Sequence, residues 1–245
     1  MPQEKGVPMG APYGMDVVES CLACEMRVPG MFCDLPPAAL QAFEAITYTT
    51  VYPKGAVLFV EGQNPRGVFI LCRGRAKLSV AAKERKRLIL KIAGPGEMLG
   101  LAATVSGKPY ELAAETMDPC HITFIKAPEF LRFVREHPEA CFGVAEQLSG
   151  KYASACHFRS RTLSRSPAER LAKLLLEWSA TAEASKSEPR FSLTLTHDEI
   201  AEMIETTRET VTRWFNRLKK RGIVKMQGAT LIICNEALLR RMARS

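Results

Sequence analysis

The chain has 245 residues, of which 47% are hydrophobic, so it can bury two cores of ordinary domain size, and disorder is excluded as its general state. It lacks an apolar run of about 18 residues and an N-terminal export signal, which predicts a cytoplasmic protein with no membrane partner. Residues 157–245 carry 17 Lys and Arg against 10 Asp and Glu, whereas residues 1–156 carry 17 against 16. This asymmetry suits a module that neutralises phosphates, and a merely soluble basic surface is the alternative.

The N-terminal residues predict a loose arm over residues 1–35. Residues 1–20 are rich in Gly, Pro and Met without periodicity, and thiols follow at Cys21, Cys24 and Cys33. Pro36-Pro37 predicts a short helix through Phe43. Eight cysteines in a chain without an export signal argue against a disulfide framework, so metal or redox use becomes the question.

Short β-like runs punctuated by glycine extend from Tyr48 to about Lys126 and predict an all-β roll or barrel within a domain at residues 36–137. Branched and aromatic side chains in these runs fit a half-buried pleated surface. The expected strands are Val57–Val60, Val68–Cys72, Ala76–Val80, Leu88–Ile92 and Ile122–Ile125.

A helical pattern follows from Glu129 to about Leu163, and we assign residues 138–164 to a dimerisation helix. One stripe of this helix carries Val144, Leu148, Ala155 and Phe158. The stripe could pair two subunits, or the helix could pack only on its own roll.

The last domain is expected at residues 165–245. Ser166-Pro167-Ala168-Glu169 predicts a helix start, with an apolar face of Leu171, Leu174, Leu175 and Trp178. The polar stretch Thr181–Pro189 then separates this helix from the remainder.

A winged helix-turn-helix is predicted next. Thr196-His-Asp-Glu199 is a capping box that opens a short helix. A three-residue break, Glu205–Thr207, leads to a basic helix, Arg208–Arg221, that ends at Gly222. Residues 223–226 and 231–234 supply a two-stranded wing around a Gln-Gly turn. A major-groove reader needs these parts in this order.

The first turns of the basic helix carry the polar residues Arg208, Glu209, Thr212 and Arg213, while its apolar residues face inward. Arginine can donate two hydrogen bonds to guanine, and glutamate can accept one from cytosine N4. A carboxylate facing DNA is otherwise costly, so Glu209 among arginines favours base readout over a solvated run of charges.

The segment Thr207-Arg-Glu-Thr-Val-Thr-Arg213 resembles the recognition helix of the CRP/FNR superfamily of bacterial regulators. The likeness covers residues 36–245, because three upstream motifs resemble that family's β-roll: Gly55-x2-Leu58-Phe59-x-Glu61-Gly62, Gly74-x-Ala76-x-Leu78 and Pro95-Gly96-Glu97-x2-Gly100. The resemblance implies an α+β fold with an N-terminal cyclic-nucleotide-binding-like β-roll (jelly roll), a long dimerisation helix and a C-terminal winged helix-turn-helix. It also implies a homodimeric transcription regulator, with a double-stranded DNA operator and RNA polymerase as partners.

By the same resemblance, Arg208, Glu209 and Arg213 would read a half-site akin to TGTGA or TTGA, and Thr212 would tune it. Thr196, His197 and Thr207 would touch phosphates. Two departures stand out. Glu205 occupies the place of a turn glycine, so a left-handed conformation there would cost about 1 kcal/mol. Arg208 follows the cyclic-AMP receptor branch, whereas the cysteines follow the FNR branch.

The signal that this chain senses is predicted from two regions. The cyclic-nucleotide branch holds the ligand phosphate with an Arg-Ser pair, and this chain has Tyr110 and Glu111 in those places. A carboxylate there would repel phosphate and the bidentate arginine is missing, which argues against a cyclic nucleotide but leaves that or another small ligand as the alternative effector.

Glu115-Thr116-x3-Cys120 resembles the segment in which FNR proteins carry their fourth cluster cysteine. The resemblance implies a 4Fe-4S cluster on Cys21, Cys24, Cys33 and Cys120 that senses oxygen, nitric oxide or redox state. The third cysteine departs from the FNR pattern, because eight residues precede it instead of five.

Four alternatives remain for these thiols: zinc on the same four cysteines, a thiol-disulfide switch of Cys21 with Cys24, haem bound through His121 or a cysteine, or no cofactor. The other cysteines, at positions 72, 141, 156 and 234, are expected to be small buried or indifferent side chains. An enzyme is not expected, since no Ser-His-Asp grouping, phosphate-cradling loop or HExxH motif occurs.

Overall fold

The computed structural model describes residues 20–24, 31–82, 87–162, 166–180, 190–192, 195–228 and 230–244, and every structural statement refers to these residues. The predicted polar gap at 181–189 and most of the N-terminal arm lie outside them. The chain divides into two compact units, residues 1–80 with 91–151 and residues 81–90 with 152–245, and each is described by itself. Among the described helices, none combines the length and apolar character required to cross a membrane.

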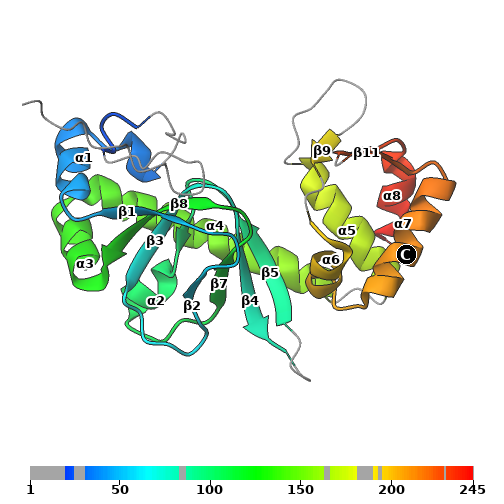
Figure 1. Cartoon of the computed structure of the whole chain (residues 1–245), viewed down its shortest axis with the longest axis horizontal. Coiled ribbons are helices and arrows are strands. Elements are labelled where there is room, and N and C mark those ends of the chain that lie inside the picture. The colour runs from blue at the N-terminus through cyan, green and yellow to red at the C-terminus, as the bar shows by residue number, and fades with distance from the viewer. Residues whose placement is uncertain are drawn as a thin grey trace, which may run out of the picture. The chain divides into compact units, whose positions relative to one another are not determined.

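The first unit is built on a β-roll of two four-stranded sheets (Figure 1). The strand orders are β1-β8-β3-β6 and β2-β7-β4-β5, and the strand pairs with described registers are antiparallel. The strands are β1 Tyr48–Tyr52, β2 Val57–Phe59, β3 Gly67–Arg73, β4 Ala76–Ala81, β5 Arg87–Ala93, β6 Met98–Leu99, β7 Ala113–Thr116 and β8 Cys120–Lys126.

Alternation along β3 and β8 separates two cores, because successive side chains of a strand point to opposite faces of its sheet. Val68 and Ile70 belong to a core on the helix-covered face, whereas Phe69 and Leu71 belong to the interior of the roll. In β8, Ile125 belongs to the first core and Ile122 to the second. The face on which a β3 or β8 side chain lies therefore determines which of the two cores it joins, and this holds for Cys72 and Cys120.

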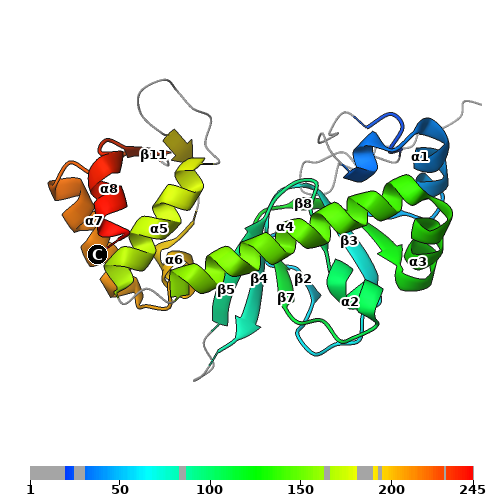
Figure 2. The ribbon, with the colours of Figure 1, turned by 180° about the vertical axis from the view of Figure 1, so that it is seen from behind.

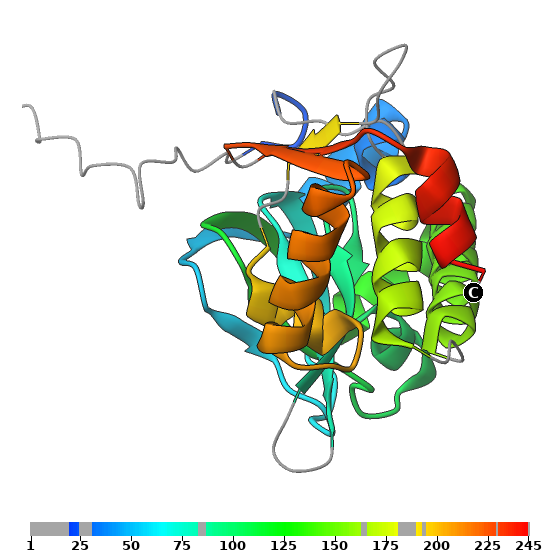
Figure 3. The ribbon, with the colours of Figure 1, turned by 90° about the vertical axis from the view of Figure 1, so that its right-hand side faces the viewer.

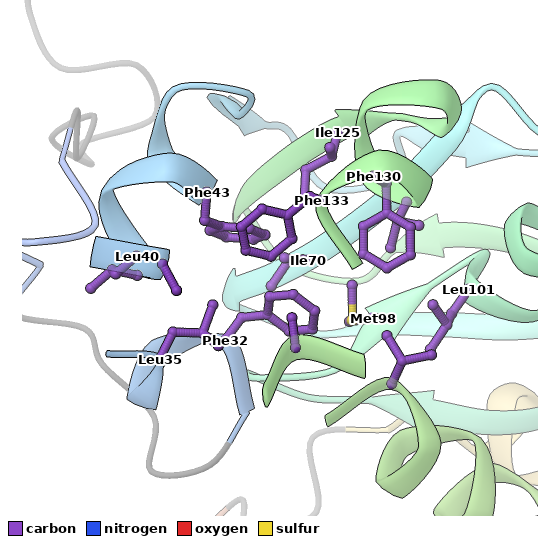
Figure 4. Close-up of a cluster of buried hydrophobic side chains, with 14 residues drawn as sticks. Phe32, Leu35, Leu40, Phe43, Ile70, Met98, Leu101, Ile125, Phe130 and Phe133 are labelled. Atoms are coloured by element: carbon purple, nitrogen blue, oxygen red, sulfur yellow. The ribbon is translucent and has the colours of Figure 1, made fainter. Parts of the chain in front are cut away.

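Aromatic side chains tie the arm segment to the helix-covered face. The 3-10 helix Met31–Asp34 packs with α1 (Pro37–Glu44) and α3 (Ala127–Glu136), and Figure 4 shows their phenylalanines converging. The Phe32 ring lies 4.9 Å from that of Phe43, and Phe43 lies 5.3 Å from Phe133. The predicted short helix after Pro36 is thereby confirmed, and its buried residues are Ala39, Leu40 and Phe43.

Tyr110 fills part of the interior of the roll. Its ring stacks on Phe59 with the centroids 4.1 Å apart, and its hydroxyl donates to the Gly67 carbonyl at 3.0 Å. The side chain is only 3% exposed. Helix α2 (Leu101–Ser106) closes this side, and Thr104 donates a second hydrogen bond to the Gly67 carbonyl at 3.0 Å.

The long helix α4 (Pro138–Thr162) runs along the roll in its first half (Figure 2). Val144 is 6% exposed and Leu148 packs against the same core, so this half of the predicted subunit-pairing stripe is used on the helix's own roll. The side chains beyond residue 156 of this helix, Phe158 among them, lie outside the described part. Gln147 donates to the Gly96 carbonyl at 3.1 Å, and Lys151 donates to the Met98 carbonyl at 2.6 Å.

The second unit contains α5, α7 and α8 beside a small sheet (Figure 3). The sheet order is β10-β11-β9, so a third strand that the sequence did not predict joins the predicted two-stranded wing. The elements are α5 Pro167–Ala180, β9 Arg190–Ser192, α6 His197–Met203, α7 Arg208–Lys220, β10 Val224–Gln227, β11 Thr230–Ile233 and α8 Glu236–Met242. The predicted α5 start is confirmed, because the Glu169 N–H donates to the Ser166 hydroxyl at 3.2 Å.

Candidate nucleic-acid interface and thiol pocket

Capping residues position α6 and α7. Thr196 accepts from the Glu199 N–H at 3.2 Å, while the Glu199 carboxylate accepts from the Thr196 N–H at 2.8 Å, so the predicted capping box is present. Thr207 caps α7 by accepting from the Thr210 N–H at 3.3 Å. Glu205 has a φ of 50° and is the one non-glycine residue with positive φ among the described residues, which confirms the left-handed turn predicted there.

The inner face of α7 anchors it in the unit. Val211, Phe215 and Leu218 are at most 1% exposed, as the apolar spacing predicted. His197 on α6 stacks on the Phe215 ring with the centroids 5.3 Å apart, and its Nδ1 lies 2.8 Å from the Thr212 hydroxyl. The two helices therefore hold each other, and Thr212 is oriented by its histidine neighbour.

The outer face of α7 forms an open groove of about 700 Å³. The lining side chains are Arg208, Glu209, Thr212, Arg213, Asn216, Arg217 and Lys220. Four cations against one carboxylate make this surface strongly basic, which is the charge that phosphates require. All four predicted reading residues lie here together.

The contacts of the groove arginines are solvent-exposed. Arg208 lies 3.6 Å from Asp198, and both side chains are more than 60% exposed. Arg213 donates to the Thr210 hydroxyl at 3.3 Å, and the Arg217 guanidinium lies 4.8 Å from the Trp214 ring centroid. Exposed ion pairs of this kind contribute little free energy, so the guanidinium groups can exchange them for a ligand.

Two titratable groups of the interface have lowered pKa values. The pKa of Glu209 is held below its usual value by hydrogen bonds from its own backbone N–H and from the Thr207 side chain, and Arg208 adds to this effect. Burial lowers the pKa of His197, with a further contribution from Lys219. These shifts favour the ionised, hydrogen-bond-accepting form of Glu209 and the neutral form of His197.

The structure gives the predicted phosphate-contacting residues different environments. Thr196 and Thr207 are exposed at helix N-termini, whereas His197 is half-buried and its Nδ1 lies within hydrogen-bonding distance of the Thr212 hydroxyl. The sequence reasoning missed Asn216, Arg217 and Lys220. Helical spacing could have revealed them, because Asn216 and Arg217 follow Arg213 by three and four residues and Lys220 follows Asn216 and Arg217 by four and three.

Four thiols line a second pocket in the first unit. Cys21, Cys24, Cys33 and Cys72 surround a cavity of about 50 Å³, with apolar neighbours that include Phe32 and Phe43. Burial raises the pKa of the Cys21 thiol to about 12, and the nearby Cys72 and Glu44 add to the rise. Burial also raises the pKa of Cys72. Thiols of this kind are protonated and weakly nucleophilic, and a metal must displace their protons to bind.

Cys120 does not join this pocket. It is completely buried in the interior core, and its thiol donates to the carbonyls of Asp118 at 3.1 Å and Arg75 at 3.4 Å. Cys72, which the sequence predicted to be a small buried or indifferent side chain, packs against the helix-covered core and lies with the arm thiols. Within the described ranges, no group of three His, Cys, Asp or Glu side chains is already spaced to hold a metal ion.

Comparisons with known proteins agree with both units. A cyclic nucleotide-binding domain model matches residues 49–137, and a Crp-like helix-turn-helix domain model matches residues 169–242. The CRP-like cAMP-activated global transcriptional regulator of Mycobacterium tuberculosis is 25% identical over 88% of this chain and 96% of its own length. The nitrogen fixation regulation protein FixK of Bradyrhizobium diazoefficiens is 25% identical over 91% of this chain and 93% of its own length.

The fold also matches solved structures of regulators. A mutant of CooA from Carboxydothermus hydrogenoformans superposes with a TM-score of 0.73 at 20% identity, covering 89% of this chain and 98% of that one. The matched families, relatives and folds are those of transcriptional regulators and not of enzymes. The chain therefore contains a cyclic nucleotide-binding domain and a Crp-like helix-turn-helix domain, and it is a DNA-binding transcription regulator of the CRP/FNR type.

Proposed function

We propose that the first turns of α7 read a specific duplex sequence in the major groove. The observation that carries this proposal is the basic groove in which Arg208, Glu209, Thr212 and Arg213 lie side by side. Arg208 and Arg213 can each donate two hydrogen bonds to guanine, while the ionised Glu209 accepts from cytosine N4. Thr212, oriented by His197, adjusts the preference.

The remainder of the interface supplies affinity without sequence information. Arg217 and Lys220 extend the groove along α7, and the exposed Thr196 and Thr207 mark the N-terminal ends of α6 and α7. Such groups fix a protein on the phosphate backbone, and their binding weakens with salt because counterions are released.

A gel-shift titration at two salt concentrations tests this function. The probe carries two TGTGA-type half-sites one helical turn apart. Arg213→Ala should cost about 1–3 kcal/mol and relax the base preference, whereas Lys220→Ala should weaken all sequences alike and reduce the salt slope by about 1. Lys54→Ala, on the roll, is the control. A protein that ignores every duplex, in air and under nitrogen, would refute the proposal.

We propose further that the regulator binds its operator as a homodimer and acts on RNA polymerase. Support for the dimer comes from α4, on which Phe142 and Tyr152 are 67% and 75% exposed. Exposed residues at positions 142, 145, 149, 152 and 156 recur at coiled-coil spacing along this helix. Light scattering measures the molar mass of wild type and of Phe142→Glu. Wild type should be a dimer and the variant should dissociate to a monomer, whereas a monomeric wild type would refute the proposal.

For the signal, we propose a 4Fe-4S cluster on thiolates of the arm and the roll, which responds to oxygen, nitric oxide or redox state. The support is the donor set, because Cys21, Cys24 and Cys33 share one pocket and iron-sulfur clusters are bound by cysteine thiolates. A cluster held there would lie among side chains that are mostly apolar, including Phe32, Phe43 and Ile70. When bound, the cluster supplies an oxidant-sensitive link between arm and roll.

The chain's own residues can transmit the state of the arm. Phe32 packs on Phe43 and Phe133, and Phe133 lies on α3, which leads directly into α4. A displacement of the arm would therefore change the packing around Phe133, next to the start of the proposed dimer helix.

A cyclic nucleotide receives less support as the signal. The buried Tyr110 already occupies the interior of the roll, and the exposed Glu111 carboxylate would repel a phosphate. Iron and acid-labile sulfide analysis of anaerobically purified protein decides between the readings. About four of each per chain, with a visible absorption that air bleaches, are expected. A colourless protein with zinc, or tight calorimetric binding of a cyclic nucleotide, would refute the cluster.

A further inference from the structure

Cys72 lies where the arm thiols meet the roll. It is on β3, and its thiol lies 3.4 Å from the Thr123 hydroxyl of the neighbouring strand β8. The pairing of these strands shifts between Leu71 and Arg73, so Cys72 occupies a β-bulge. Cys72 lies an even number of residues from Val68 and Ile70, so alternation along β3 places it on the same helix-covered face as these residues, and it packs against that core. Bulges are frequent beside functional sites.

The strand geometry places Cys120 on the opposite face. Cys120 and Ile122 of β8 point into the interior core, whereas Ile125, an odd number of residues from both, points to the helix-covered core against which Cys21 and Cys72 pack. Gly74 closes over Cys120, because a Cβ at that position would lie 2.5 Å from the Cys120 sulfur. A thiol held there cannot reach the arm without a change in the register of β8.

We propose that Cys72 is the fourth thiolate of the arm site, with Cys21, Cys24 and Cys33, and that Cys120 is a structural core residue. The proposal rests on the cluster function proposed above and assigns its ligand on the roll. Four thiols around one pocket match the ligand number of a 4Fe-4S cluster.

This assignment connects the site to α4. The same pocket is lined by Leu71 and Gly96, and Gly96 accepts the hydrogen bond from Gln147 of α4. The Leu71 N–H in turn donates to the Glu97 carbonyl at 3.0 Å. A ligand at Cys72 therefore adjoins the backbone turn that holds the long helix.

Serine variants of the full chain test the assignment. Cys72→Ser replaces the thiol beside Thr123 by a hydroxyl, which can still form a hydrogen bond with Thr123. Cys120→Ser tests the alternative ligand. Cys234→Ser is the control, at an exposed thiol of the other unit. Each protein is purified anaerobically and its iron, sulfide and visible absorption are measured, with circular dichroism and the melting temperature of the metal-free form as folding controls. Cys72→Ser should lose nearly all iron and colour while the other two variants keep them.

A second readout is independent of the cluster. Mild oxidation of metal-free wild type, followed by peptide mass mapping, should link Cys72 to one of the arm cysteines and leave Cys120 unlinked. Colour lost in Cys120→Ser but kept in Cys72→Ser, or an arm-to-Cys120 link, would overturn the assignment and leave the cluster function standing. Wild type without iron under strict anaerobiosis would overturn both.

Discussion

Replacing Glu205 by glycine should stabilise the C-terminal unit. Glu205 has a φ of 50°, a left-handed conformation that costs an L-residue roughly 1–2 kcal/mol and glycine almost nothing. Glycine also lowers the free energy of unfolding by roughly 0.5–1 kcal/mol, because it gives the unfolded chain more conformational freedom. The net gain is about 0.5–1 kcal/mol, or roughly 2–8 °C in the transition of a unit of about 80 residues.

Calorimetry of the full chain measures this shift, and a series at the same position isolates its cause. Asparagine tolerates the left-handed region, so Glu205→Asn should fall between wild type and Glu205→Gly, while Glu205→Ala should stay near wild type. Arg170 donates to the Glu205 carbonyl at 3.2 Å, a backbone contact that all three variants keep. If Glu205→Gly melts below wild type, or no higher than Glu205→Ala, backbone strain at this turn is not the controlling factor.

Three further predictions concern stability. Tyr110→Phe should cost about 0.5–1.5 kcal/mol in denaturant unfolding, because the hydrogen bond from Tyr110 to the Gly67 carbonyl is lost while the one from Thr104 remains; an unchanged midpoint would contradict this. Thr196→Ala should lower the free energy of unfolding by about 1 kcal/mol, because the Glu199 N–H loses the side-chain oxygen that caps it, whereas Thr196→Ser should retain this hydrogen bond. Burial lowers the pKa of His197 below 6.5, so the unfolded chain binds this proton first on acidification. Stability of the C-terminal unit should therefore fall as pH drops below about 6.5, and His197→Asn should flatten that part of the pH profile.

The sequence alone determined features that depend on neighbours along the chain. The capping box at Thr196, the helix start at Ser166 and the left-handed turn at Glu205 are set by residues within four positions of one another. The reading face of α7 follows from helical spacing in the same way. Short strands such as β6 and β7 lack a pattern long enough to be recognised before their partners are known.

Only the tertiary structure decided which thiols meet. Cys72 and Cys120 both belong to apolar strand segments, and their environments depend on the register of β3 against β8 and on one bulge between them. That register is set by packing of strands about fifty residues apart in the chain, and a one-residue shift would move a side chain to the other face of the sheet. Local spacing therefore identifies the candidate cysteines, but the long-range pairing of strands determines the face of the sheet on which each one lies.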